Sequence, residues 1–125
     1  MSAVLEKLIA SEVDAREYGF DWTNREMIID WIISEAKEVL ASIEDNESNE
    51  RIQEEIGDVL HAAISLCLYS GFDIEETLEK TTKKFDLRMH WLKAIAKQRG
   101  LDTLNGQSEE FMLDLWSQAK LASKS

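Results

Sequence analysis

Two pairs of acidic residues with the same spacing are the part of this sequence best suited to chemistry. The first pair is Glu35 and Glu38, and the second is Glu55 and Asp58. On an α-helix, residues three positions apart lie on one side, about 60° apart around the axis, so each pair presents its carboxylates together. The polar stretch 43–50 between the pairs is typical of the turn of a helical hairpin. We therefore expect the two pairs to face each other on adjacent antiparallel helices.

The apolar residues around these acids indicate that some of the carboxylates point toward the core. Each expected helix carries one apolar stripe at helical spacing, formed by Ile28, Ile32, Val39 and Ile43 on the first and by Ile52, Val59, Ala62 and Leu66 on the second. Glu35 and Glu55 fall inside these stripes, and Glu38 and Asp58 lie on their shoulders. Acids on a solvated face need no explanation, but acids on a core-facing stripe do.

The electrostatic cost of this arrangement predicts a bound cation. At an effective dielectric constant of about 20, two carboxylates several ångströms apart repel each other by roughly 2–3 kcal/mol. Left uncompensated, such repulsion would consume much of the stability of a small domain, so either protons or a cation must relieve it. The cluster offers only oxygen ligands, which hard divalent cations prefer. We expect Glu35, Glu38, Glu55 and Asp58 to bind Mg²⁺, with Mn²⁺ as an alternative.

Composition limits the fold and the partners. With 125 residues, no proline and five glycines, the chain is expected to form one domain, residues 1–125, of long helices. No stretch alternates between apolar and polar residues as a strand would. The net charge of −11 makes nucleic acids and anionic membranes unexpected partners. There is no basic-then-apolar leader and no apolar run near 18 residues, so a cytoplasmic location is expected.

The helical pattern predicts an all-α bundle whose two central antiparallel helices carry the acids. We expect helices over residues 1–18, from an N-cap at Thr23 to about Ile43, from about Glu50 to Ser70, from a cap at Asp73 to Arg99, and after a cap at Ser108. The core face of the fourth helix is expected to comprise Leu78, Thr81, Phe85, Met89, Leu92 and Ala96. Apolar residues beyond a single stripe, such as Ile29 and Ile33, predict a homodimer or homotetramer.

Basic residues on the later helices have two interpretations. Lys84 and Arg88 are four positions apart and so share one side of a helix. They are either solvated cations on an ordinary amphipathic helix, for which Glu79 or other acids could be partners, or a clamp on phosphate oxygens. Trp116 and Lys120 are also four positions apart. Trp116 could equally belong to a ligand-binding site or pack in the core. No Gly-rich phosphate loop is present.

The remaining aromatic and histidine residues are expected to be structural. This expectation covers Trp22, Trp31, Trp91 and His61. His61 follows Asp58 by three positions, as in di-iron bundles, but the first acidic helix has no matching histidine. Trp22 adjoins a loop, where it could instead stack on a nucleobase.

The acidic motifs resemble those of MazG-type nucleoside triphosphate pyrophosphohydrolases. The run from Glu54 to Leu60, Glu-Glu-Ile-Gly-Asp-Val-Leu, is similar to the second motif of that family, and Glu35-x-x-Glu38 is similar to the first. The resemblance extends from about Asp21 to Lys120. One departure is Ser34, where the family often has a further acid.

This resemblance implies an all-α, oligomeric enzyme that uses Mg²⁺ to hydrolyse nucleoside triphosphates to the monophosphate and pyrophosphate, in nucleotide-pool house-cleaning. It implies metal binding by the four acids, and we expect Glu38 and Glu55 to be catalytic. Glu38 is our choice for the carboxylate that orients or deprotonates the water, because it lies on the shoulder of its stripe. The resemblance also implies substrate binding by Lys84, Arg88, Trp116 and Lys120. Related dUTPase-like and phosphoribosyl-ATP pyrophosphohydrolases are alternatives. A non-enzymatic acidic bundle that binds divalent cations or a partner protein is another.

Overall fold

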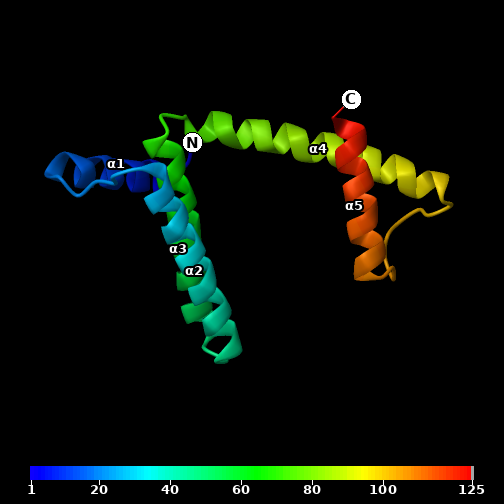
Figure 1. Cartoon of the computed structure of the whole chain (residues 1–125), viewed down its shortest axis with the longest axis horizontal. Coiled ribbons are helices and arrows are strands. Elements are labelled where there is room, and N and C mark those ends of the chain that lie inside the picture. The colour runs from blue at the N-terminus through cyan, green and yellow to red at the C-terminus, as the bar shows by residue number, and fades with distance from the viewer. Residues whose placement is uncertain (125) are drawn as a thin grey trace. The chain divides into compact units, whose positions relative to one another are not determined.

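The computed structural model describes residues 1–124, and all of the regular structure within them is helical (Figure 1). The helices are α1 (Ala3–Tyr18), α2 (Arg25–Glu44), α3 (Asn49–Tyr69), α4 (Ile74–Gln98) and α5 (Glu109–Ser123). The predicted all-α class is confirmed. Among the described residues no helix is both long and apolar enough to cross a membrane. The chain forms two compact units, the first covering Met1–Thr77 and the second beginning at Leu78.

Side-chain caps set the helix starts, as the sequence indicated, with one correction. Asp73 Oδ2 accepts a hydrogen bond from the Glu76 amide at 2.9 Å, and Ser108 caps α5 in the same way. The predicted N-cap of α2 at Thr23 was wrong, because Asn24 Oδ1 accepts from the Met27 amide at 2.9 Å. Asparagine caps at least as well as threonine, so the two adjacent candidates could not be separated by residue type.

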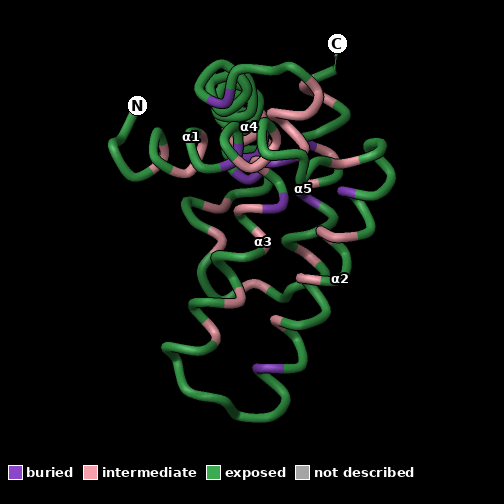
Figure 2. The backbone as a smooth tube through the Cα atoms, turned by 90° about the vertical axis from the view of Figure 1, so that its left-hand side faces the viewer, coloured by how far each residue is buried: buried purple, intermediate pink, exposed green. Residues whose placement is uncertain are grey.

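The first unit is built around the α2–α3 hairpin. These two helices run antiparallel and pack along each other, with Ile28 and Ala62 fully buried (Figure 1). The loop region, residues 43–51, is exposed (Figure 2). Helix α1 is joined to α3 by polar contacts, since Arg16 donates a hydrogen bond to the Ser65 carbonyl oxygen at 3.3 Å. The hairpin therefore positions both acid pairs.

The second unit has a small core where α5 packs on the C-terminal part of α4. The buried residues there are Leu92, Ala96, Leu115 and Ala119. Only this part of the predicted core face of α4 is buried, because the 15 residues of α5 cover only part of the 25-residue α4. Leu78 and Phe85 remain 56% and 52% exposed within the chain, and Thr81 is exposed as well.

Candidate metal centre and basic cluster

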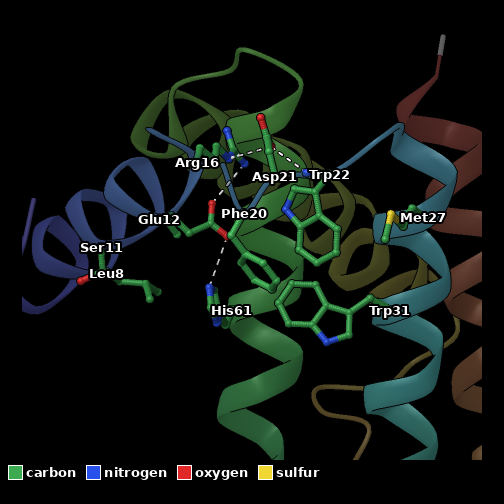
Figure 3. A pocket seen from close by; sticks show the side chains of 11 residues that line it. Leu8, Ser11, Glu12, Arg16, Phe20, Asp21, Trp22, Met27, Trp31 and His61 are labelled. Carbon is green, nitrogen blue, oxygen red and sulfur yellow. Dashed lines mark hydrogen bonds and ion pairs between the residues drawn. The ribbon is translucent and has the colours of Figure 1, made fainter. Parts of the chain in front are cut away.

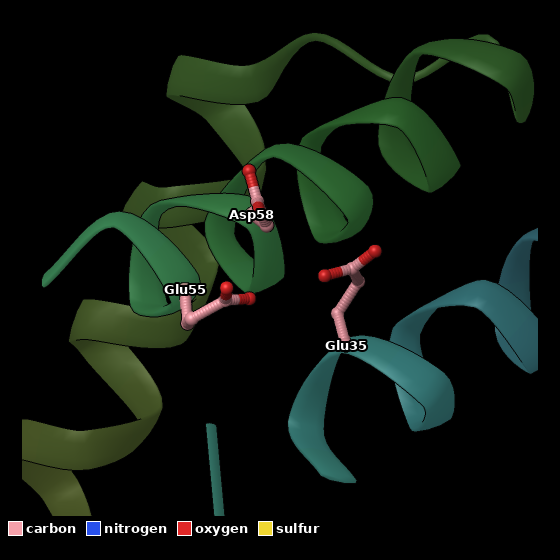
Figure 4. Close-up of side chains that lie close together, drawn as sticks. All are labelled: Glu35, Glu55 and Asp58. Atoms are coloured by element: carbon pink, nitrogen blue, oxygen red, sulfur yellow. The ribbon is translucent and has the colours of Figure 1, made fainter. Parts of the chain in front are cut away.

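Three of the four predicted metal ligands meet at the middle of the α2–α3 hairpin. Glu35 lies on α2, and Glu55 and Asp58 lie one turn apart on α3. Each contributes a carboxylate oxygen, and these oxygens all lie within 4.8 Å of one another (Figure 4). Glu35 and Glu55 are half-buried and Asp58 is exposed, in keeping with their places inside and beside the apolar stripes.

Glu35 is held from one side by an indole of its own helix. The Trp31 Nε1–H group donates a hydrogen bond to Glu35 Oε1 at 2.9 Å. The other oxygen, Oε2, is buried and meets no hydrogen-bond donor in the described part of the chain. A buried carboxylate oxygen without a donor is costly, so this atom favours a ligand that brings positive charge.

Glu38, the fourth predicted ligand, lies beside this trio rather than within it. It is exposed, yet the pKa of its carboxyl is raised, first because its protonated form can hydrogen-bond to Glu35 and then because the Glu35 charge repels its ionised form. Partial desolvation and the charge of Glu55 raise the pKa further. The charge of Glu35 therefore makes ionisation of Glu38 less favourable, as expected for two acids three positions apart on one helix.

A single arginine compensates part of the charge. Arg51 donates to Glu54 Oε2 at 2.9 Å and to Glu55 Oε1 at 3.2 Å, one turn before the cluster. The Arg51 side chain is 54% exposed, so solvent screens much of this attraction. The cluster keeps a negative surplus after this pairing.

The group of carboxylate oxygens fits a hard divalent cation. All of its ligand atoms are carboxylate oxygens, three of them are close enough to share one ion, and Glu35 Oε2 lacks any protein donor among residues 1–124. Mg²⁺ and related ions prefer such ligands and often complete their coordination with water or phosphate oxygens. The exposed side of the cluster, at Asp58, leaves room for those additional ligands.

A cavity of about 230 Å³ lies behind Trp31 in the same unit (Figure 3). Its aromatic wall includes Trp22 and Trp31, which stack with their ring centroids 4.9 Å apart. A buried acid, Glu12, forms its polar part and pairs with Arg16 at 3.1 Å and with the ring nitrogen of His61 at 3.3 Å. The cavity can therefore receive a small ring system that offers both a flat apolar face and polar edges.

The predicted substrate-binding residues all lie in the second unit, and three of them meet there. Arg88 Cζ and Lys120 Nζ each lie 5.9 Å from the centre of the Trp116 ring. Phe85 packs against the same indole at 5.9 Å between centroids. Lys84 is exposed one turn before Arg88. Trp116 packs against the core, as one of its two interpretations expected, and its ring also contacts two cations.

These cations have no acidic partners in the described chain. None of Lys84, Arg88 and Lys120 forms an ion pair with a residue in the range 1–124, and Arg88 Nε is buried without an acceptor. Pairing of these cations with nearby acids is therefore not seen in this range, although acids outnumber bases 25 to 14 in the chain. Lys84 and Lys120 are exposed, as the alternative of solvated cations expects. An unpaired basic group beside an aromatic ring suits an anionic ligand.

Sequence reasoning missed two residues that support the acids. Trp31 was expected to be structural, but it directs Glu35, and Arg51, which was assigned no role, pairs with Glu55. Both lie four positions before the acid that they contact, so the i, i+4 spacing could have identified them. Glu12 carried no such signal, because its partner His61 is on another helix.

The part of the chain that carries this site is similar to known proteins. The family model of the MazG nucleotide pyrophosphohydrolase domain matches residues 23–92, more than half of the chain and the whole of the acidic hairpin. A protein of Escherichia coli (strain K12) named "Nucleoside triphosphate pyrophosphohydrolase" is 32% identical over 103 residues, which are 82% of this chain and 39% of that protein. A Thermotoga maritima protein named "Nucleoside triphosphate pyrophosphohydrolase/pyrophosphatase MazG" is 30% identical over 107 residues, 86% of this chain and 40% of its own length. The chain thus spans about two fifths of these relatives.

Proposed function

We propose that this chain, which belongs to the MazG nucleotide pyrophosphohydrolase family, hydrolyses nucleoside triphosphates to the monophosphate and pyrophosphate. The observation that carries this proposal is the group of three carboxylates whose oxygens lie within 4.8 Å of one another, with a donor-free buried oxygen on Glu35. Both matched relatives carry names that state this activity, and the match includes all four predicted ligands. We place the activity in the cytoplasm, in nucleotide-pool house-cleaning.

In this proposal Glu35, Glu38, Glu55 and Asp58 hold Mg²⁺, or Mn²⁺ in its place. When bound, the cation neutralises charge on the phosphates and makes water a better nucleophile. Water attacks a phosphorus of the α–β anhydride, the bridging P–O bond breaks, and the proton of the water is taken up by a carboxylate. Glu38 is our choice for that acceptor, because it lies beside the three clustered acids, is exposed to solvent and has a carboxyl pKa raised by its neighbour Glu35.

The basic cluster of the second unit would bind the phosphate chain. Arg88 offers a planar fork of donors and Lys84 and Lys120 offer point charges, so together they can neutralise a triphosphate. Their lack of acidic partners within residues 1–124 supports this role. Trp116 would keep Arg88 and Lys120 in place through its ring face.

The cavity behind Trp31 is our candidate for the nucleobase. Its volume of about 230 Å³ suits one ring system, and Trp22 offers a flat face on its wall. Phe20→Ala, which removes another aromatic side chain from the cavity wall but keeps the ring stacked on Trp31, should then raise KM for a nucleoside triphosphate about 10-fold or more while inorganic tripolyphosphate, which has no base, is affected little. An equal effect on both compounds would contradict binding of the nucleobase in this cavity.

The protein is further proposed to act as a homodimer or homotetramer. Large apolar side chains are exposed along α2, α3 and α4, among them Ile33, Leu60, Leu78 and Phe85. Burial of such faces between chains would stabilise an assembly by about 25 cal/mol per Å² of apolar surface. Light scattering at micromolar concentration should give a multiple of 14.3 kDa, and the monomer mass would contradict the assembly.

A product assay tests the function directly. The protein is incubated with Mg²⁺ and each of the common nucleoside triphosphates, dUTP and phosphoribosyl-ATP, and the products are separated. Monophosphate and pyrophosphate in equal amounts are expected. Activity confined to dUTP or to phosphoribosyl-ATP would indicate one of the related pyrophosphohydrolases. No turnover of any compound, with retained cation binding, would favour a non-enzymatic cation-binding bundle.

A further inference from the structure

Trp31 lies between the cavity and the acidic cluster and touches both. Its indole N–H donates to Glu35 Oε1 at 2.9 Å, and its ring forms part of the cavity wall (Figure 3). The contact joins successive turns of α2, so no loop movement is needed to maintain it. Trp31 is thus the only described residue that both lines this cavity and donates a hydrogen bond to a proposed ligand.

The indole is itself fixed by neighbours from two other segments. Trp22, in the connector before α2, stacks on it at 4.9 Å with the rings inclined by 29°. His61, on α3, meets it edge-on at 5.3 Å and 79°. A ring held on its face and at its edge has few alternative rotamers, so the direction of its N–H group is fixed as well.

A fixed donor restricts a carboxylate that would otherwise turn freely. The terminal torsion of glutamate is broad, so an unsupported carboxylate samples many orientations. With Oε1 bound to Trp31, the second oxygen remains without a protein donor, and the Glu35 carboxylate is directed toward Glu55 and Asp58 (Figure 4). This arrangement reduces the conformational entropy that Glu35 loses when a cation binds.

We propose that Trp31 is a positioning residue for the cation site, in which its N–H group fixes Glu35 in the cation-binding orientation. The inference rests on the proposed function, because it requires that the acidic cluster binds a divalent cation. It predicts that removal of this one N–H group weakens cation binding by about 10-fold or more, the effect typical of partners that orient metal ligands. It also predicts that the fluorescence of the Trp31 indole changes when the cation binds, because the indole and the cation contact the same carboxylate.

Trp31→Phe is the direct test, since phenylalanine keeps an aromatic ring but has no donor. Binding of Mn²⁺ alone, without nucleotide, is measured by calorimetry for the wild type, Trp31→Phe and the matched control Trp91→Phe, which alters an indole of the second unit. Tryptophan fluorescence is recorded in the same titrations. We expect weaker binding and no fluorescence change for Trp31→Phe, and wild-type behaviour for Trp91→Phe.

The outcomes separate this inference from the proposed function. Wild-type Mn²⁺ affinity in a folded Trp31→Phe variant would overturn the positioning role and leave the cation site intact. If the wild type itself binds no Mn²⁺, the cation site fails and the positioning role fails with it. Should Trp31→Phe not fold, benzothienylalanine at position 31 keeps the shape of the indole without the N–H group, and wild-type affinity in that protein would equally overturn the inference.

Discussion

The acidic cluster of the first unit and the basic cluster of the second use the same helical spacing but are supported in different ways. Glu35 and Glu55 are each contacted by a donor four positions earlier on the same helix, Trp31 and Arg51. Arg88 and Lys120, in contrast, both lie over one ring, that of Trp116, and have no acidic partner among residues 1–124. The acids are oriented by hydrogen bonds, and the cations are oriented by packing.

This difference predicts two kinds of response to substitution. The acidic cluster contains repulsion that only a cation relieves, so loss of one charge should abolish function while the metal-free protein becomes no less stable. In the basic cluster Arg88 and Lys120 each contact the Trp116 ring, so loss of one cation should weaken substrate binding and remove a favourable cation–ring contact, without any gain in stability.

The largest expected effect is that of Glu55→Gln. It should abolish pyrophosphate release, and in metal-free buffer it should leave the free energy of unfolding unchanged or raise it by up to about 2 kcal/mol, because one repelling charge is gone. Glu54→Gln is the matched control, since Glu54 pairs with the same Arg51 but is not one of the three clustered acids. Near-full activity of Glu55→Gln would show that Glu55 is not a ligand.

The next largest effect is expected in the basic cluster. Lys84→Ala and Arg88→Ala should each lower kcat/KM roughly 30- to 1000-fold, because a charge-assisted contact to phosphate is worth about 2–4 kcal/mol in the transition state. Arg88→Lys should restore only part of the activity, since an ammonium group cannot make a two-pronged contact. Lys83→Ala, at the neighbouring exposed position, is the control. Unchanged kcat/KM in both alanine variants would show that Lys84 and Arg88 do not bind phosphate and are ordinary surface residues of the helix.

The smallest expected effect concerns the pH dependence of stability. The pKa of Glu38 is raised in the folded protein, so the folded state binds this proton more tightly than the unfolded state does. The resulting stability is fully present below the ordinary pKa of glutamate and is lost as the pH rises through the raised value. Glu38→Gln should therefore gain stability relative to the wild type as the pH increases through this window, in metal-free buffer.

Urea unfolding at several pH values, with Glu47→Gln as the control in the exposed loop, measures this difference. A constant difference between wild type and Glu38→Gln at all pH values would mean that Glu38 does not share negative charge with Glu35. Added Mg²⁺ should reverse the difference, because the cation stabilises the ionised carboxylate.

The parts of the fold that could be predicted from the sequence are those that depend on local spacing. Helical periodicity and capping residues located the helices, and the stripe around Glu35 and Glu55 placed these acids on facing helices. Burial was less predictable, because periodicity identifies an apolar face but not what covers it. Leu78 and Phe85 show this, since they continue the stripe of Leu92 but remain more than half exposed, although Phe85 contacts Trp116 of α5.

Contacts between distant segments were beyond the reach of the sequence for the same reason. The pairing of Glu12 with His61 joins α1 to α3 across 49 positions, and no local pattern predicts such a contact. Trp31 and Arg51 differ, because each contacts a residue of its own helix. The contact between Trp31 and Glu35 could have been predicted from their spacing, but Trp31 was assumed to be structural because it is aromatic.

The central claim is that the acidic hairpin is a cation site for triphosphate hydrolysis, and the metal dependence of pyrophosphate release tests it most directly. The protein is assayed with a nucleoside triphosphate, first with Mg²⁺, then with EDTA in excess, and finally after Mg²⁺ is restored. We predict pyrophosphate release in the first assay, none in the second and recovery in the third. Release that continues undiminished in excess EDTA would contradict the account.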